Sequence, residues 1–237
     1  MVSSESRTEE KVDIDTFEFT SEISSVSEVV EVEESLSGYL RIKRYTDVIL
    51  AAIGILALSP VLLIVMLLIK WEDPKGEILF KQQRVGKDGK LFYMYKFRSM
   101  VSNAEALKAT LMDKNEASGP VFKIRLDPRV TRVGSFIRKT SIDELPQLIN
   151  VLRGEMTLVG PRPALPDEVA LYTDYERQRL SVTPGLTCYW QVSGRSNIGF
   201  DEWVQMDLQY IEERSMLVDL KLICKTVLVL FGSKDAC

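Results

Sequence analysis

The longest apolar run of the chain covers residues 48–69 and is interrupted only by Gly54 and by Ser59-Pro60. At a rise of about 1.5 Å per residue, about twenty apolar residues form a helix that crosses the hydrocarbon core of a bilayer. Pro60 lacks a backbone N–H and crowds the preceding turn, whereas the Ser59 hydroxyl can donate a hydrogen bond to a nearby carbonyl. The pattern predicts a membrane-anchoring helix within residues 38–75, kinked at Ser59-Pro60.

The basic residues at the two ends of this run do not select one orientation in the membrane. Arg41, Lys43 and Arg44 precede the run, and Lys70, Lys75 and Lys81 follow it. The positive-inside rule therefore favours neither end, as expected for a re-entrant helix whose two ends lie on the cytoplasmic side. A kinked helix that spans the bilayer fits these charges equally well. A buried core helix fits less well, because the run is long and apolar on every face.

The pattern from residue 76 onward is typical of one compact domain. Residues 78–85 and 91–97 flank Gly86-Lys87-Asp88-Gly89, which predicts a β-hairpin with an Asp-Gly turn. Helical spacing of apolar residues follows at 103–113, 145–152, 167–180, 202–214 and 216–231. The last of these stretches is expected to pack on the core or to lie in the membrane interface. The predicted fold class is mixed α/β and mainly helical, with a small β-hairpin and amphipathic interface helices.

The acidic residues are concentrated at the start of the chain. The net charge is −4, but the first 40 residues hold 11 of the 34 acidic residues and only 2 of the 30 basic ones. Residues 1–37, which are rich in Ser, Glu and Val, are therefore predicted to form an acidic disordered tail. The rest of the chain is mildly basic, which suits phosphate-bearing ligands and an anionic membrane surface. Its basic residues are spread out, so no nucleic-acid partner is expected.

The residue types that are present restrict the possible chemistry. The chain contains no histidine, which excludes a Ser-His-Asp triad, His-ligated zinc and an imidazole general base. Its three cysteines, Cys188, Cys224 and Cys237, are widely spaced and odd in number, which indicates reduced thiols. Catalysis must therefore rest on carboxylate, amine, guanidinium, thiol or hydroxyl groups.

Two adjacent carboxylates, Asp143 and Glu144, precede a predicted helix. Pro146 is tolerated in a first helical turn, which favours a cap at or near Asp143. A cap at Ser141 would form a Ser-X-X-Glu capping box but would place Pro146 in the helix interior. With the cap at Asp143, both carboxylates lie at the positive end of the helix dipole, which favours their ionised forms. An ordinary acidic helix start has the same pattern.

Nearby arginines favour a role for this carboxylate pair at a phosphate group. Arg138 lies just upstream and can bind phosphate oxygens as a planar fork. Arg162 stands between Pro161 and Pro163, which restrict the backbone on both sides. Adjacent residues on a helix point in different directions, so one carboxylate can act as nucleophile and the other as metal ligand. A surface arginine in a Pro-rich loop is the simpler alternative for Arg162.

Several further motifs occur in a fixed order over about residues 40–237. They are Lys43-Arg44-X-X-Asp47, Gln83-X-X-Gly86, Tyr95-Lys96-Phe97-Arg98-Ser99-Met100, Asp127-Pro128-Arg129, Ser141-X-Asp143-Glu144-Leu145-Pro146-Gln147, Gly160-Pro161-Arg162-Pro163, Pro184-Gly185-Leu186-Thr187 and Trp190-Gln191-Val192-Ser193-Gly194-Arg195. Together with the Ser-Pro-broken helix, this order resembles the bacterial sugar transferase family, the monotopic polyprenol-phosphate phosphoglycosyl transferases. The chain looks like the minimal catalytic form of this family, with an added acidic tail.

The resemblance implies transfer of a sugar 1-phosphate from a UDP-sugar to undecaprenyl phosphate, with release of UMP. It implies that Asp143 is the nucleophile of a covalent intermediate and that Glu144, with Asp143, binds Mg²⁺. It implies that Arg138 binds phosphate and that Pro161-Arg162-Pro163 shapes the nucleotide site. Weaker candidates for substrate phosphates are Lys96, Arg98 and Arg195.

The resemblance also implies a location and a topology. Residues 76–237 would form a catalytic domain on the cytoplasmic face of the bacterial inner membrane, and Ser59-Pro60 would turn the helix back. Membrane lipid is then a direct contact, and polysaccharide assembly proteins are candidate partners. Two other functions are considered, a non-catalytic module that binds sugar nucleotides and a metal-dependent hydrolase of sugar nucleotides. The intact carboxylates and arginines argue against the first, and the membrane helix argues against the second.

Overall fold

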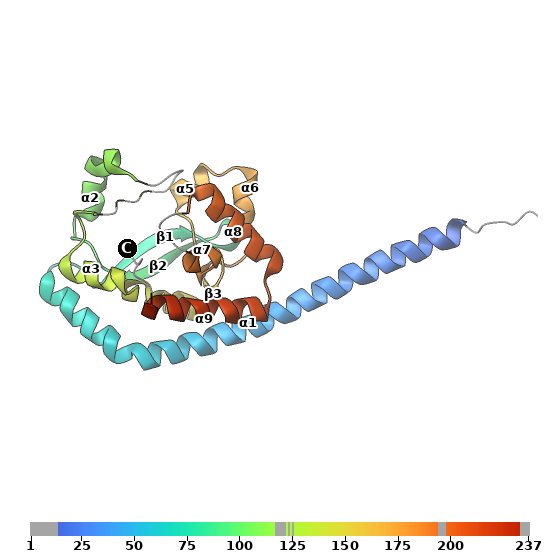
Figure 1. The fold of residues 1–237 in the computed structure, drawn as a ribbon, viewed down its shortest axis with the longest axis horizontal. Coiled ribbons are helices and arrows are strands. Elements are labelled where there is room, and N and C mark those ends of the chain that lie inside the picture. The colour runs from blue at the N-terminus through green and yellow to red at the C-terminus, as the bar shows by residue number, and fades with distance from the viewer. Residues whose placement is uncertain (1–13, 117–121, 123, 125, 194–197, 233–237) are drawn as a thin grey trace, which may run out of the picture. The chain divides into compact units, whose positions relative to one another are not determined.

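The computed structural model describes residues 14–116, 122, 124, 126–193 and 198–232 (Figure 1). It divides into two units, Met1–Ile42 and Lys43–Cys237, with helix α1 (Ile14–Glu72) continuing from the first into the second. The helical backbone of 14–37 differs from the disordered tail that the sequence predicts. Residues 14–37 contain no Gly or Pro, so the sequence has no strong helix breaker there.

The second unit contains two small sheets. Strands β1 (Leu79–Val85) and β2 (Leu91–Phe97) pair antiparallel and form the predicted hairpin. Its turn contains the short 3₁₀ segment η1 (Lys87–Gly89), in which Asp88 and Gly89 have φ angles of 56° and 78°. Asp and Gly tolerate this left-handed conformation better than other residues, which explains the Asp-Gly pair. Strands β3 (Thr157–Val159) and β4 (Gly185–Thr187) form a parallel pair.

Short helices surround these sheets (Figure 1). In chain order they are α2 (Ala104–Lys108), η2 (Ala109–Lys114), α3 (Arg132–Lys139), η3 (Ile142–Glu144), α4 (Gln147–Arg153), α5 (Pro166–Ala170), α6 (Asp174–Arg177), η4 (Gln178–Ser181), α7 (Tyr189–Val192), α8 (Phe200–Glu213) and α9 (Met216–Gly232). The prediction of one continuous helix over 167–180 is wrong. Thr173 and Glu176 form a capping box that begins a new helix after α5.

The apolar run remains helical through Pro60. The Ser59 hydroxyl donates a hydrogen bond of 2.8 Å to the carbonyl of Leu56, as its position beside the proline predicts. Figure 1 shows that α1 bends within the half that belongs to the second unit. Leu36–Glu72 is long and apolar enough to cross a membrane, and it is the one such segment within the described residues.

Polar contacts attach the beginning of the apolar run to the rest of the second unit. Lys43 Nζ lies 2.6 Å from Asp219 Oδ2 of α9. Asp47, which is buried, accepts hydrogen bonds from the Thr157 hydroxyl and from the backbone N–H of Leu158, both in β3. These carboxylates and their partners fix α1 against β3 and α9 at this end.

A second set of polar contacts attaches the other end of the run. The Glu72 carboxylate accepts hydrogen bonds of 2.9 and 3.1 Å from the first two backbone N–H groups of α3, a favourable position for a negative charge. Asp73 forms an ion pair with Arg98, which follows β2. Both ends of the apolar run are therefore bonded to one and the same domain.

One face of α1 packs on this domain, and the opposite face is exposed. Ala51 packs on β2, α4 and the start of β3, whereas Val65 and Ile69 pack on Phe97 and Ile137. The exposed large apolar residues of 48–72 are Ile49, Leu50, Ile53, Leu56, Val61, Leu63, Ile64, Leu67 and Trp71. A continuous exposed apolar face of this kind is typical of a surface that contacts lipid or another protein.

Candidate active site

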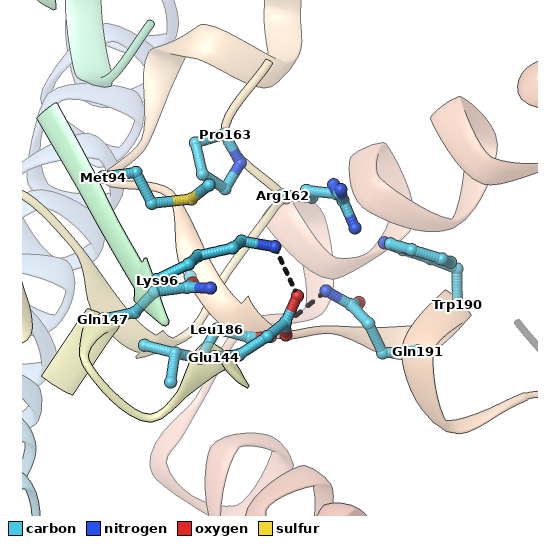
Figure 2. A pocket seen from close by; sticks show the side chains of 10 residues that line it. Met94, Lys96, Glu144, Gln147, Arg162, Pro163, Leu186, Trp190 and Gln191 are labelled. Carbon is cyan, nitrogen blue, oxygen red and sulfur yellow. Dashed lines mark hydrogen bonds and ion pairs between the residues drawn. The ribbon is translucent and has the colours of Figure 1, made fainter. Parts of the chain in front are cut away.

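A pocket lies where the end of β2, η3, the loop after β3 and α7 meet. Figure 2 shows side chains from these four segments pointing toward one another. The lining residues are Met94, Lys96, Glu144, Gln147, Arg162, Pro163, Gly185, Leu186, Trp190 and Gln191. The sequence therefore predicted four of them as site residues, namely Lys96, Glu144, Arg162 and Pro163.

The predicted helix cap at Asp143 is wrong. Asp143 lies inside the 3₁₀ segment η3, which follows Ser141 at a left-handed φ of 54°. Helix α4 begins only at Gln147, with Pro146 as its N-cap. A proline suits this position, since the first helical turn leaves its N–H groups without intrahelical partners. Asp143 and Glu144 are therefore placed by a tight turn and not by the first turn of an α-helix.

Burial, and not a helix dipole, controls the ionisation of Asp143. Its side chain is buried, and this burial together with the adjacent Glu144 charge raises its pKa to about 6. Lys96 and Arg138 partly oppose the rise. The expectation that the dipole favours the ionised form is therefore wrong for Asp143. Asp143 does not line the pocket itself, but it interacts electrostatically with Lys96 and Glu144, which do.

Glu144 and Lys96 form an ion pair at the pocket. Lys96 Nζ lies 2.7 Å from Glu144 Oε1, and the two residues are 48 positions apart in the sequence (Figure 2). Burial lowers the pKa of Lys96, and the Glu144 charge opposes that shift. The pair holds the Lys96 amine inside the pocket, and the role of Lys96 as a phosphate ligand stays a prediction.

Arg162 enters the pocket from the loop after β3. Its guanidinium carbon lies 5.8 Å from the centre of the Trp190 ring, within the range of a cation–π contact (Figure 2). Its neighbour Pro161 is fully buried, so the loop has little freedom to move. Arg162 thus lies between two buried prolines and lines the pocket, whereas its presentation from a rigid turn stays a prediction.

Arg84 is a residue of the site that the sequence reasoning missed. It is buried on β1 and donates hydrogen bonds to the Pro163 carbonyl, at 2.9 Å, and to Gln82 Oε1, at 2.6 Å. Burial and the nearby Arg162 charge lower its pKa to about 10. Arg84 occupies a variable position of the Gln83-X-X-Gly86 motif, so the motif gave no signal for it. Its role is to hold the loop that carries Arg162.

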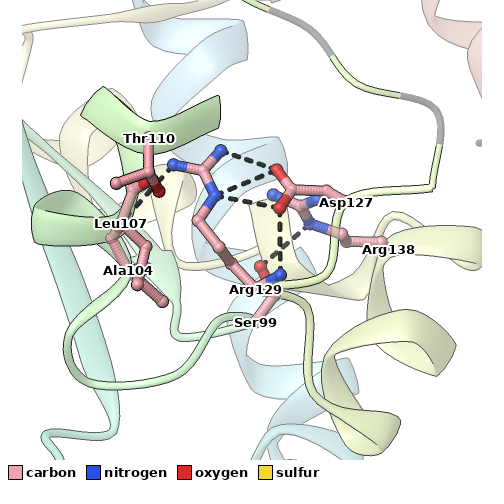
Figure 3. A network of polar contacts seen from close by, with 7 residues as sticks. All are labelled: Ser99, Ala104, Leu107, Thr110, Asp127, Arg129 and Arg138. Atoms are coloured by element: carbon pink, nitrogen blue, oxygen red, sulfur yellow. Dashed lines mark hydrogen bonds and ion pairs between the residues drawn. The ribbon is translucent and has the colours of Figure 1, made fainter. Parts of the chain in front are cut away.

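Arg138 belongs to a polar network beside the pocket (Figure 3). Its Nε donates a hydrogen bond of 3.0 Å to the Ser99 hydroxyl. In the same network the Arg129 guanidinium binds both oxygens of Asp127, with contacts of 2.6 to 3.2 Å, and lowers the pKa of that carboxyl. The Asp127-Pro128-Arg129 motif therefore forms an ion pair within itself. The Ser99 hydroxyl holds the Arg138 guanidinium in place, a role that the sequence did not indicate.

One of the weaker phosphate candidates, Arg98, does not line the pocket. It pairs with the Asp73 carboxylate and also donates to the Asp73 carbonyl, at 3.0 Å, so it fixes the end of α1. Arg98 follows the last residue of β2, and its guanidinium is committed to Asp73. Arg195 lies outside the described residues.

The carboxylates can contribute to a Mg²⁺ site but cannot complete one alone. Within the described residues, no group of three or more Asp, Glu or Cys side chains is arranged to hold a metal ion. Mg²⁺ commonly uses one or two carboxylates together with water and substrate phosphates. Asp143 and Glu144 fit such a shared site, in which the substrate provides the remaining oxygens.

Comparison with known proteins places this arrangement in a family. Residues 38–233 match the family described as Bacterial sugar transferase. The chain belongs to the bacterial sugar transferase family. The match covers the apolar helix from residue 38 and the domain that carries the pocket, so the resemblance noted from the short motifs is confirmed.

Relatives in the family differ in length. The chain is 47% identical over 197 residues to the galactosyl transferase CpsE of Streptococcus agalactiae serotype III, covering 82% of this chain and 43% of CpsE. It is 42% identical to the exopolysaccharide production protein ExoY of Sinorhizobium fredii, covering 78% of this chain and 83% of ExoY. It is 41% identical to the undecaprenyl-phosphate galactose phosphotransferase of Salmonella typhimurium, covering 82% of this chain and 41% of that protein. This bacterial sugar transferase thus spans less than half of two of these relatives and most of ExoY.

Proposed function

We propose that the chain transfers a sugar 1-phosphate from a UDP-sugar to undecaprenyl phosphate and releases UMP, a membrane step of polysaccharide biosynthesis. The observation that carries the proposal is the pocket itself, in which Lys96, Glu144 and Arg162 converge beside the buried Asp143. Cationic side chains around a carboxylate suit a reaction between two anions. Family membership and the names of the relatives support the same substrates.

In the first proposed step, a carboxylate oxygen of Asp143 attacks the β-phosphorus of the UDP-sugar. The bond between this phosphorus and the bridging oxygen breaks, and UMP leaves with the electron pair. The product is an acyl phosphate that links Asp143 to the phosphosugar. In the second step, an oxygen of undecaprenyl phosphate attacks the same phosphorus, which releases the Asp143 carboxylate and the lipid diphosphate sugar.

The electrostatics of the site suit this nucleophile. A pKa of about 6 leaves Asp143 mainly ionised at neutral pH, while its basicity exceeds that of an ordinary aspartate. Lys96, Arg138 and Arg162 supply positive charge that offsets the repulsion between carboxylate and phosphate. Glu144 and Asp143 would hold Mg²⁺, and such an ion would supply further positive charge to offset the charge of the leaving group.

We propose further that α1 enters the cytoplasmic leaflet of the inner membrane and returns to the same face. As a straight helix, residues 48–69 would extend about 33 Å, enough to separate their ends by a whole bilayer core. Lys43 and Glu72 are nevertheless bonded to the same domain. Tyr45 and Trp71, which are 71% and 82% exposed near the two ends, suit the headgroup region on one side.

Helix α9 supports this placement. It exposes the apolar residues Leu217, Leu220, Val227 and Leu228, and it is joined to the beginning of the apolar run by the Lys43–Asp219 contact. An amphipathic helix with such a face suits the membrane interface. The site would then lie where a soluble sugar nucleotide and a lipid phosphate can both reach it.

The proposed reaction is tested with purified protein in detergent, Mg²⁺, undecaprenyl phosphate and a panel of UDP-sugars. We expect lipid-dependent UMP release that is abolished by Asp143→Asn and retained by Asp88→Asn, a matched change at an exposed turn. Intact-protein mass spectrometry without the lipid should detect the added phosphosugar on the wild-type and Asp88→Asn chains but not on Asp143→Asn, with at most one UMP released per chain. Full turnover of Asp143→Asn would remove Asp143 as nucleophile. Repeated turnover without lipid would favour a hydrolase, and no release from any donor would favour a binding module.

A further inference from the structure

Trp190 carries a buried hydrogen-bond donor to which no described residue offers an acceptor. The side chain lines the pocket and is only 9% exposed. Its indole nitrogen is buried and has no hydrogen-bond partner within the described residues. Leaving a buried donor without a partner has a substantial free-energy cost, so such groups in pockets commonly serve a ligand.

The Trp190 ring is held from behind and faces the pocket. The Trp203 ring packs against it, with centroids 4.6 Å apart. Figure 2 shows the indole nitrogen on the edge of the ring toward Arg162 and Gln191. The Trp190 N–H is therefore fixed by packing, and its direction is set before any ligand arrives.

The position of Arg162 indicates which ligand atom this donor serves. The guanidinium carbon lies 5.8 Å from the centre of the Trp190 ring, so a ligand oxygen bound by the N–H would also be close to the guanidinium. An anionic oxygen satisfies both donors better than a neutral hydroxyl, since hydrogen bonds to charged acceptors are the stronger ones. The neighbouring Lys96 charge is already paired with Glu144, which leaves the Arg162 side of the pocket as its more cationic side.

We propose that the Trp190 indole N–H and Arg162 together bind a phosphate oxygen of the uridine nucleotide, on the part that leaves as UMP. This inference rests on the proposed function and adds to it a specific ligand contact. It assigns Trp190 to donor-nucleotide binding, with Trp203 as the residue that keeps its ring in place. This role could not be inferred from the motif around Trp190, because a tryptophan in a short motif is equally consistent with a core residue.

The test compares Trp190→Phe with Trp71→Phe, because each removes one indole N–H and keeps an aromatic ring, and Trp71 is 82% exposed on α1 and does not line the pocket. UMP binding to the full-length protein in detergent is measured by calorimetry, with uridine as the ligand that lacks the phosphate. We expect Trp190→Phe to weaken UMP binding by about 10- to 100-fold, as for loss of a hydrogen bond to a charged group. Uridine binding should change by less than about threefold, as should UMP binding to Trp71→Phe.

An independent measurement uses the wild-type chain, so that the test does not depend on how Trp190→Phe folds. The chain has three tryptophans, Trp71, Trp190 and Trp203, and ¹⁵N labelling makes their indole N–H signals separately observable. UMP should shift the indole N–H signal of Trp190. This signal is assigned as the one that is missing from the spectrum of Trp190→Phe, or as the one that is present in the spectra of both Trp203→Phe and Trp71→Phe.

Three outcomes of the binding measurements would overturn the inference. They are unchanged UMP binding by Trp190→Phe, an equal loss of uridine binding, and an equal loss of UMP binding in Trp71→Phe, which would point to a general effect of losing an indole ring. An unshifted Trp190 signal at saturating UMP would do the same. In each case, lipid-dependent UMP release by the wild-type chain would show that the proposed function stands and that this contact alone is wrong.

Discussion

Replacing Asp143 by Asn should stabilise the folded chain while it abolishes transfer. Burial and the Glu144 charge raise the pKa of Asp143 from 3.8 to about 6 in the folded state. An acid with a raised folded-state pKa is harder to ionise in the folded than in the unfolded chain. Ionisation of Asp143 therefore costs stability, and the cost is absent below about pH 4, grows between pH 4 and 6, and is complete above pH 6.

The size of the effect follows from the pKa difference. A rise of about two units corresponds to about 3 kcal/mol, at about 1.4 kcal/mol per unit. This value is an upper limit on the gain in stability for two reasons. Asp143 and the adjacent Glu144 do not titrate independently, and the amide of the new Asn side chain needs hydrogen-bond partners of its own. For a domain of this size, each kcal/mol shifts the melting temperature by about 2–4 °C. Asp143→Asn should therefore melt up to about 6–12 °C higher than the wild-type chain at pH 7.5.

Thermal unfolding in one detergent, followed by intrinsic fluorescence at pH 4.5 to 8, measures this gain. The difference between Asp143→Asn and wild type should increase with pH up to about pH 6 and then remain constant. The exposed Asp88→Asn change should show no such dependence. A destabilised Asp143→Asn chain, or a gain in stability that is the same at every pH, would refute the argument that ionisation of the buried Asp143 carboxylate destabilises the folded chain.

Two further predictions concern the packing of α3 and the membrane topology. Gly134→Ala should destabilise the chain by about 3 kcal/mol or more in thermal unfolding, because the added Cβ would lie 1.9 Å from the Ser99 carbonyl oxygen. The control Gly38→Ala, whose added Cβ would meet no atom within 4 Å, should have no such effect. Single cysteines at positions 45 and 75, in a chain without its native cysteines, should both react with a membrane-impermeant reagent from the cytoplasmic side. Labelling from opposite sides would exclude the re-entrant helix, and a Gly134→Ala chain as stable as wild type would exclude the close packing on Ser99.

Local patterns accounted for the elements but not for how the site residues are used. The hairpin, the long apolar helix and the last two helices each depend on residues close together in the chain. The separate helices within 166–181 were missed because a capping box restarts the helix inside an otherwise periodic segment. The cap of α4 was misplaced because Ser141 adopts a left-handed backbone conformation that the residue type does not announce.

The sequence by itself determined the family and the long apolar helix, and it marked Asp143 and Glu144 as a candidate pair, because these are encoded in periodicity and short motifs. Only the tertiary structure decided that Asp143 is buried with a raised pKa, that Lys96 pairs with Glu144 and that Arg98 is committed to Asp73. Ionisation and pairing depend on the groups that surround a side chain in space, and here those groups come from segments up to about 50 residues apart. A motif names the residues of such a site, but folding decides the environment that gives each its chemistry.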